Sequence, residues 1–305
     1  MAAGHEVGRA ILKRQIAEEH IILYRTESGQ PVAMADRCPH RLAPLSMGRL
    51  VGDAVECGYH GITFDCTGKC IRIPGESRIL ERFSATTYPA LERWGFVWAW
   101  LGEKEKADEK LLPRHFKYQT EPGWCPLDGY VHVQGQYQLL IDNLLDLSHE
   151  AFLHKGTIGN DAVADTPAVT TVKDGMIEVF RFMKNCSPPK LFVRAGGFDT
   201  NIDRYQKIHF FPPCFVAIEV WAAPTGTEEK RVKWWVLNAL TPETARSTHY
   251  FWALPRGMKL EDRELTEALK AGVYRTFAED KAIVEQQQII LDRVPLESRS
   301  VFTPA

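Results

Sequence analysis

The sequence "CPHRLAPLSMGRLVGDAVECGYHGITFD", residues 38–65, contains two cysteines and two histidines in two short pairs. The first pair is Cys38-x-His40, sixteen residues follow, and the second pair is Cys57-x-x-His60. Prolines stiffen the first loop, and glycines in the second loop let backbone N–H groups approach a bound group closely. Thiolates and imidazoles both ligate zinc and iron, so the two pairs predict a metal centre held between two loops.

The way the ligands are paired favours one metal centre over another. A Cys2His2 zinc site usually has its two cysteines close together along the chain and its two histidines likewise, whereas each pair here combines both residue types. Two loops that each offer one thiolate and one imidazole suit a [2Fe–2S] cluster with Rieske ligation, in which one iron takes both sulfurs and the other takes both nitrogens. Zinc, and scattered core cysteines with surface histidines, are the alternatives. We therefore predict that a Rieske [2Fe–2S] cluster binds four residues: Cys38, His40, Cys57 and His60.

The composition is that of an ordinary globular protein. The 305 residues are 45% hydrophobic and 25% charged, with a formal net charge of −2, and no basic stretch indicates nucleic-acid binding. No apolar run reaches the roughly 18 residues of a membrane span, and the first residues do not resemble a signal peptide. Seven cysteines are an odd number, which argues against a disulfide framework. We expect a cytoplasmic protein that contacts neither membrane nor nucleic acid.

The chain around the motif is organised in two parts. Residues 20–38 and 95–102 are β-prone, no amphipathic helix is apparent between residues 20 and 100, and a mixed-charge segment follows at residues 102–110. The second part has one helical segment at residues 137–156, a long helix near 261–292, and several strand-like segments: 168–183, 215–224, 233–242 and 247–255. The pattern predicts an α+β protein. Residues 1–112 form a β-rich cluster-binding domain, and residues 113–305 form a catalytic domain with an antiparallel sheet flanked by helices.

The sequence "CPHRLAPLSMG…VECGYHGITFD" resembles the Rieske non-haem iron ring-hydroxylating oxygenases. Within them it is most similar to the branch of vanillate O-demethylase oxygenase and dicamba monooxygenase, and the resemblance covers nearly the whole chain. It implies a terminal oxygenase that uses O2 and electrons from NAD(P)H, supplied by a ferredoxin or flavin reductase. It also implies a mononuclear Fe(II) site besides the cluster, and a head-to-tail homotrimer.

A second group of polar residues lies in "LLIDNLLDLSHEAFLH", residues 139–154. Asn143, Asp146 and His149 recur at steps of three, which places them on one stripe of a helix. His154 follows five residues after His149, about 140° further around an ideal helix, so both can reach one metal only if the helix ends or bulges between them. A zinc metalloprotease motif needs H-E-x-x-H, and "HEAFLH" has one residue too many. Chance placement of two histidines is the other alternative.

Two histidines and a carboxylate form the facial triad of mononuclear iron(II) oxygenases. In the last helix, Asp280 lies on an apolar stripe, where a carboxylate is costly unless it is paired or binds a metal. Glu279 and Glu285 lie off that stripe and are expected to be solvated. The resemblance independently selects Asp280, because "FAEDKAIVEQQQ" is similar to the segment that carries the third iron ligand. We predict that His149, His154 and Asp280 bind iron.

The resemblance assigns roles to the two remaining residues. Asp146 would connect His149 to His60 of the neighbouring subunit and so couple the two metal centres. Asn143 would lie close to the iron. The expected reaction is O-demethylation or hydroxylation of a substituted, vanillate-like aromatic acid. The alternatives are dihydroxylation of an aromatic ring and, less favoured, a Rieske electron-transfer protein without catalysis of its own.

Overall fold

The computed structural model describes residues 1–79, 82–173 and 175–294. The chain divides into two compact units, Met1–Lys117 and Tyr118–Ala305. The first is β-rich and the second combines a large antiparallel sheet with helices, so the predicted α+β class is confirmed. The division at residues 112 and 113 stays a prediction.

The first unit consists of three small sheets joined by tight loops. Their strand orders are β1-β11-β10, β2-β3-β4-β9 and β5-β6-β7-β8, all antiparallel. The strands are β1 (Ala2–Ala3), β2 (Leu12–Ile16), β3 (Glu19–Arg25), β4 (Pro31–Ala35), β5 (Arg49–Val51), β6 (Ala54–Glu56), β7 (Thr63–Phe64), β8 (Cys70–Arg72), β9 (Thr87–Tyr88), β10 (Ala90–Arg93) and β11 (Phe96–Ala99). Short 3₁₀ helices connect them: η1 (Gly4–Glu6), η2 (Leu45–Met47), η3 (Lys104–Lys106), η4 (Glu109–Leu111) and η5 (Arg114–Gln119).

The apolar core of this unit surrounds the two cysteines of the motif. Cys38 and Cys57 belong to one buried cluster with Ile22, Leu45 and Phe64. The first loop follows β4 and the second connects β6 to β7, so strands on both sides fix the ends of each loop. The sheets therefore hold the two sulfurs within an apolar shell.

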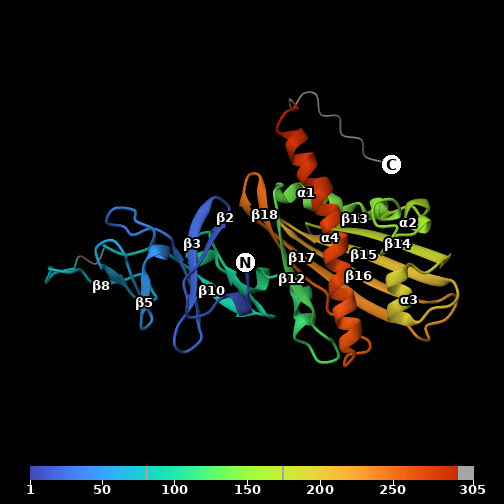
Figure 1. The fold of residues 1–305 in the computed structure, drawn as a ribbon, viewed down its shortest axis with the longest axis horizontal. Coiled ribbons are helices and arrows are strands. Elements are labelled where there is room, and N and C mark those ends of the chain that lie inside the picture. Colours follow the sequence, from blue (N-terminus) through green and yellow to red (C-terminus); the bar gives the residue numbers. More distant parts are fainter. Residues whose placement is uncertain (80–81, 174, 295–305) are drawn as a thin grey trace. The chain divides into compact units, whose positions relative to one another are not determined.

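The second unit is built on a seven-stranded antiparallel sheet with strand order β12-β18-β17-β16-β15-β14-β13. The strands are β12 (Asp128–Val133), β13 (Val169–Lys173), β14 (Met176–Cys186), β15 (Ile202–Phe211), β16 (Phe215–Pro224), β17 (Val232–Thr244) and β18 (Ser247–Ala253). The helices are α1 (Tyr137–Leu145), η6 (Leu147–Ala151), α2 (Asp161–Asp165), α3 (Lys190–Gly196) and α4 (Arg263–Leu291). Figure 1 shows α4 crossing the sheet, with α1 and α3 beside it.

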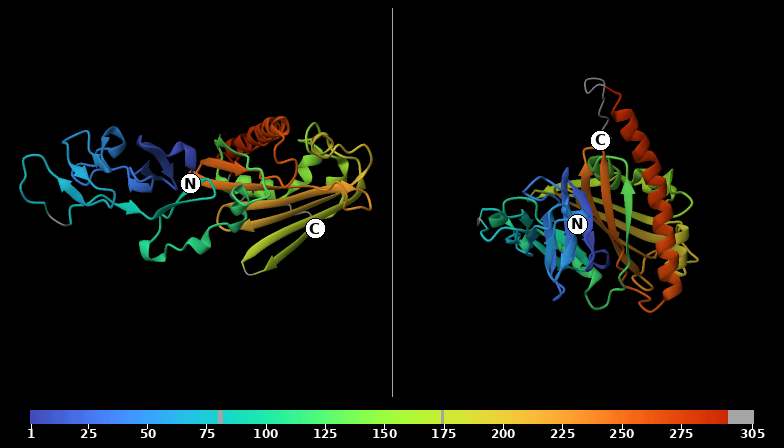
Figure 2. Two further views of the ribbon diagram at one scale, coloured as in Figure 1. Left: turned by 90° about the horizontal axis from the view of Figure 1, so that it is seen from below. Right: turned by 60° about the vertical axis from the view of Figure 1, so that its left-hand side comes forward.

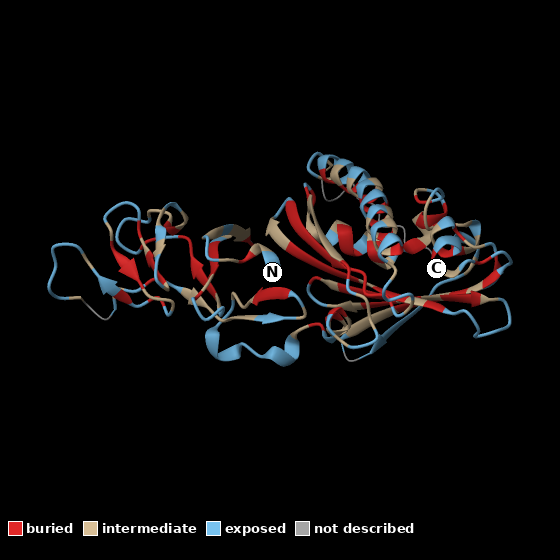
Figure 3. Ribbon diagram, turned by 60° about the horizontal axis from the view of Figure 1, so that its bottom comes forward, coloured by how far each residue is buried: buried red, intermediate tan, exposed pale blue. Residues whose placement is uncertain are grey.

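The helices of the second unit lie on one face of the sheet, as the left view of Figure 2 shows. Helix α4 contacts α1, α3 and β12, and α1 and α3 also contact β17. Buried and exposed residues alternate along α4 (Figure 3), because an amphipathic helix packs only its apolar stripe against the sheet. The space between these helices and the sheet is where the predicted iron ligands meet.

Most predicted elements of this unit are confirmed, and one is partly wrong. Strand β16 matches the predicted residues 215–224, and α4 lies within the predicted 261–292. The predicted helix over residues 137–156 is wrong beyond Leu145, where α1 ends and a 3₁₀ turn begins. Within the part of the chain that the structure describes, none of the helices combines the length and apolarity needed to cross a membrane.

Candidate cluster and iron sites

The two loops of the first unit bring like ligands together. Cys38 and Cys57 are buried, with 1% and 2% of their surface exposed. His40 and His60 are exposed, and their ring centroids lie 4.8 Å apart in an edge-on arrangement. The two sulfurs are buried together and the two imidazoles are exposed together. Rieske ligation needs this arrangement, because one iron binds both sulfurs and the other binds both imidazoles.

The backbone repeats the same turn in both loops. The N–H of Leu42 donates to the carbonyl of Cys38 at 2.9 Å, and the N–H of Gly61 donates to the carbonyl of Cys57 at 3.0 Å. Leu42 and Gly61 both have left-handed backbone conformations, with φ of +56° and +66°. At Gly58, a Cβ atom would lie 2.5 Å from a backbone carbonyl oxygen of η2, so only glycine fits there. The two loops are therefore shaped as a matched pair.

The chemistry of these donors fits an iron–sulfur cluster. Burial, together with the neighbouring Cys57, outweighs the backbone hydrogen bonds of His40 and Arg41 and raises the pKa of Cys38 to about 11. A thiol in this environment stays protonated until a metal displaces the proton, so cluster binding and deprotonation are linked. The apolar surroundings of the sulfurs and the open side at the imidazoles agree with a cluster whose histidine edge faces outward.

In the second unit, the chain breaks the helix where the histidines require it. Helix α1 ends at Leu145, and the side chain of Asp146 accepts a hydrogen bond from the N–H of Ser148 at 3.0 Å. This cap starts η6, which carries His149, and further turns bring the chain back to His154. An Asp followed two residues later by a backbone donor is an Asx turn, which competes with helix continuation.

The three predicted iron ligands converge. His149 Nε2 lies 3.4 Å and His154 Nε2 lies 3.0 Å from Asp280 Oδ1, and the two imidazole centroids are 5.0 Å apart. Their ligand atoms all lie within 4.8 Å of one another. Asn143 Nδ2 donates to Asp280 Oδ1 at 3.1 Å, so all four residues meet at one point. Two imidazoles and one carboxylate on one side of a metal position are the donors of a facial triad.

The electrostatics of the triad suit a divalent cation. Burial raises the pKa of Asp280, but the hydrogen bonds and charges of His149 and His154 outweigh burial and bring the pKa to about 2. Burial lowers the pKa of each histidine, but Asp280 outweighs burial and raises both. A metal ion would take the place of the protons that these imidazoles attract, because ligation needs neutral imidazole and ionised carboxylate.

The other ring nitrogen of each histidine also has a partner. His154 Nδ1 lies 2.7 Å from Glu279 Oε2, so the expectation that Glu279 is merely solvated is wrong. His149 Nδ1 lies 2.7 Å from the backbone carbonyl of Asp146. Partners of this kind fix the tautomer and orientation of a metal-binding imidazole. The sequence signal that could have indicated this role is the position of Glu279 directly before Asp280, the carboxylate on the apolar stripe of the helix.

The carboxylate of Asp146 does not contact His149; only the backbone carbonyl of Asp146 does. The residue is exposed, and its side chain bonds Ser148 rather than His149. Burial raises the pKa of Asp146, but the hydrogen bonds of Ser148 and the charge of Arg181 outweigh burial and lower it. The residue therefore presents an ionised carboxylate to the surface, directly beside the backbone that holds His149.

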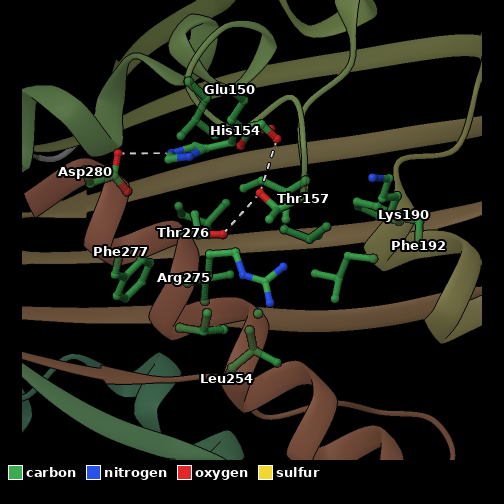
Figure 4. Close-up of a pocket in the computed structure, with 18 of the residues that line it drawn as sticks. Glu150, His154, Thr157, Lys190, Phe192, Leu254, Arg275, Thr276, Phe277 and Asp280 are labelled. Atoms are coloured by element: carbon green, nitrogen blue, oxygen red, sulfur yellow. Dashed lines mark hydrogen bonds and ion pairs between the residues drawn. The ribbon is translucent and has the colours of Figure 1, made fainter. Parts of the chain in front are cut away.

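A cavity of about 280 Å³ opens from the triad. Helix α4, helix α3 and strands β15 to β17 surround it, and Figure 4 shows His154 and Asp280 at one end of it. Its walls are mostly apolar: Leu144, Leu147, Phe192, Ile218, Val220, Trp234, Val236, Leu254, Val273 and Phe277. An apolar cavity with a few polar groups is typical of a binding site for a small molecule.

Two protein families match the chain. The Rieske [2Fe–2S] domain matches residues 2–89, and the vanillate O-demethylase oxygenase C-terminal domain matches residues 133–304. The first match contains all four predicted cluster ligands. The second contains all three predicted iron ligands.

Individual relatives match over most of the chain. The vanillate O-demethylase oxygenase subunit of Pseudomonas sp. (strain HR199 / DSM 7063) is 36% identical over 294 residues, which are 93% of this chain and 82% of the relative. The toluene-4-sulfonate monooxygenase system iron-sulfur subunit of Comamonas testosteroni is 35% identical over 93% of this chain and 85% of the relative. The crystal structure of dicamba monooxygenase bound to 3,6-dichlorosalicylic acid superposes with a TM-score of 0.94 at 30% identity, covering 99% of this chain and 90% of that chain.

These similarities extend through both units and both metal centres. The cofactors are a Rieske [2Fe–2S] cluster and a mononuclear non-haem iron, and a separate reductase or ferredoxin supplies the electrons. The chain belongs to the vanillate O-demethylase family of Rieske non-haem iron oxygenases, as the oxygenase component of a monooxygenase.

Proposed function

We propose that this oxygenase removes a methyl group from, or hydroxylates, a substituted aromatic acid, with iron bound by His149, His154 and Asp280. The observation that carries the proposal is the convergence of these three side chains at one end of an apolar cavity. In the same proposal, Cys38, His40, Cys57 and His60 hold the Rieske cluster. The iron supplies reductive activation of O2 when it is bound.

The protein's own residues bind and orient the substrate. The apolar walls of the cavity exclude water and hold an aromatic ring, and Asn143 keeps Asp280 in place through its 3.1 Å hydrogen bond. The relatives are named for vanillate and for toluene-4-sulfonate, which are both aromatic anions. For a methoxy substrate the balance is ArOCH3 + O2 + NAD(P)H + H⁺ → ArOH + CH2O + H2O + NAD(P)⁺.

The assembly and the electron path belong to the same proposal. We propose a head-to-tail homotrimer in which Asp146 links His149 to His60 of the neighbouring subunit. The exposure and lowered pKa of Asp146 support this, because an ionised surface carboxylate can accept hydrogen bonds from imidazoles of two chains. A cytoplasmic location stays a prediction.

The experiment combines metal analysis with product analysis. Anaerobically purified protein is expected to contain about three irons and two acid-labile sulfides per chain, and no zinc. With NADH and a reductase that serves Rieske oxygenases, the enzyme is expected to release one formaldehyde per phenol formed from methoxybenzoates such as vanillate. A cis-diol product would instead assign ring dihydroxylation. An iron content of two per chain that does not rise after addition of Fe(II) would mean that the protein is an electron carrier without catalysis of its own.

A further inference from the structure

Four cationic side chains line the cavity of the proposed substrate site. Two of them already have a carboxylate partner: Arg204 lies 2.7 Å from Glu150 in a buried pair, and Arg194 lies 3.5 Å from Glu264 in an exposed one. The other two are Lys190, at the start of α3, and Arg275, on α4. Across residues 1–79, 82–173 and 175–294, neither of these two makes an ion pair or hydrogen bond, so the cavity has positive charge that no described residue balances.

Arg275 is exposed on α4 and lines the cavity where it opens to solvent. Ala268, Ala271, Gly272 and Arg275 follow steps of three, one and three, so they form one stripe of the helix, and all four line the cavity. The three small residues leave space in front of this stripe. Figure 4 shows the guanidinium of Arg275 directed away from Asp280 and toward the side where Lys190 and Phe192 lie.

The acidic groups around Arg275 are engaged elsewhere. Glu279 is one helical turn away from Arg275 and bonds His154, while Glu150 bonds Arg204 and Gln206. Asp280 belongs to the triad. The guanidinium of Arg275 is therefore available to an anion that enters the cavity from outside the protein.

We propose that Arg275, assisted by Lys190, binds the carboxylate or sulfonate of the substrate and so determines which aromatic anions are oxidised; this inference rests on the proposed function. A guanidinium forms paired hydrogen bonds to either anion, while the apolar walls of the cavity hold the ring that carries it. An ammonium group such as that of Lys190 adds charge without this paired geometry.

The position of Arg275 also selects the substitution pattern of the ring. Arg275 precedes Asp280 by five residues, which is about 7.5 Å along the helix axis, and its side chain points further away. The anion and the oxidised group must therefore lie on well-separated ring carbons. Para and meta substituents satisfy this, whereas an ortho substituent lies directly beside the anion and cannot reach the triad.

The test measures binding and turnover separately on the fully loaded enzyme. Calorimetric affinities are determined for 4-methoxybenzoate, toluene-4-sulfonate, 2-methoxybenzoate and the neutral 4-methoxybenzamide. We expect Arg275→Gln to weaken binding of the first two by about 10- to 100-fold and to leave the benzamide within about twofold. Lys190→Gln has a smaller effect in the same direction. Lys270→Gln is the matched control, because this lysine lies on the same helix as Arg275 but does not line the cavity, and it leaves all affinities unchanged.

Formaldehyde release from the methoxybenzoates then gives the regiochemistry, with 4- and 3-methoxybenzoate oxidised and 2-methoxybenzoate bound without turnover. The inference is overturned if Arg275→Gln and Lys270→Gln have equal effects, if wild type binds 4-methoxybenzoate and 4-methoxybenzamide equally, or if no aromatic anion binds. If the anions bind through Arg275 but no methoxyarene or methylarene is oxidised, the proposed function fails while the anion site stands.

Discussion

At the scale of single residues, Asp280 concentrates the interactions of the iron site. It accepts from Asn143 and lies within hydrogen-bonding distance of both histidines, and its pKa of about 2 keeps it ionised at every working pH. We expect Asp280→Asn to lower the iron content from about three to about two per chain while sulfide stays at about two. Three irons per chain in this variant would contradict the assignment. Glu285→Gln, on the same helix, serves as the control.

Glu279 provides a graded test of the same site. Its contact with His154 Nδ1 fixes which nitrogen of the ring faces the metal. Removing such a partner typically costs about 10- to 100-fold in metal affinity without abolishing binding. Glu279→Gln should therefore release iron to a chelator faster than wild type, with the cluster spectrum unchanged. Equal release rates would mean that this contact does not support the metal site.

A separate group at the other side of the sheet predicts pH dependence. Glu243 Oε2 lies 2.5 Å from His132 Nε2, and Glu243 Oε1 lies 3.7 Å from His249 Nε2. Burial raises the pKa of Glu243, but hydrogen bonds with His132 and Ser247 outweigh burial and lower it below 4.5. A depressed folded-state pKa stabilises the fold above the unfolded value, and this stabilisation is lost as the pH falls through the folded value.

Glu243→Gln is therefore expected to lower the free energy of unfolding by about 1–3 kcal/mol at pH 7. The difference from wild type should narrow as the pH falls below 4.5. Denaturant unfolding at several pH values measures this difference in the free energy of unfolding. Glu228→Gln, which breaks an exposed ion pair, should show little difference at any pH. A difference that stays constant through acid pH would rule out the ionised carboxylate as its source.

At the scale of elements, the sequence predicted the burial of Asp280 but not the path of the chain around the two histidines. The apolar stripe of α4 placed Asp280 in the interior because periodicity is a local property of the chain. The end of α1 at Leu145 was missed because the leucines of this segment favour helix on both sides of Asp146. An Asx turn at Asp146 is compatible with the sequence, but the helix propensity of Asp alone does not decide whether the residue caps a helix or lies inside one.

Contacts between elements that are distant in sequence could not be predicted at all. The buried side chains of Glu150 and Arg204 lie 2.7 Å apart, with 4% and 1% exposed, and join the turn that carries His149 and His154 to β15. Arg204 also donates to the carbonyl of Ile158 at 3.0 Å. Nothing in either local sequence identifies the other partner, because the pairing exists only after the sheet has formed.

This ion pair yields a prediction with a control on the same strand. Breaking a buried pair leaves an uncompensated charge, so Arg204→Met should lower the free energy of unfolding by about 3–5 kcal/mol. Lys207 lies on the opposite face of β15 and forms a partly exposed pair with Glu178, so Lys207→Met should cost about 0–1 kcal/mol. Denaturant unfolding compares the two. Similar losses would show that the Glu150–Arg204 pair does not hold the histidine turn in place.

At the scale of the whole molecule, the proposed trimer implies that the cluster of one chain passes its electrons to the iron of the neighbouring chain and not to the iron of its own chain. Asp146 exposes an ionised carboxylate beside the backbone that supports His149, and His60 is exposed at the edge of the cluster loops. If Asp146 joins these residues across a subunit boundary, Asp146→Asn should keep both cofactors and the trimeric mass in sedimentation. Turnover should nevertheless fall, because the link between the two imidazoles is weakened. Full activity in this variant would remove Asp146 from the electron path.

Mixed trimers give the sharper test, because they separate transfer between chains from transfer within one chain. Cys57→Ser removes the cluster from one variant, and Asp280→Asn removes the iron from the other, so each is inactive alone. When the two are co-expressed, a chain with an intact cluster can lie next to a chain with an intact iron site. Random ring assembly then restores about a quarter of wild-type formaldehyde release, since half of the donors and half of the acceptors are intact. Transfer confined to single chains leaves the mixture inactive, even where sedimentation and iron content show that mixed trimers have formed.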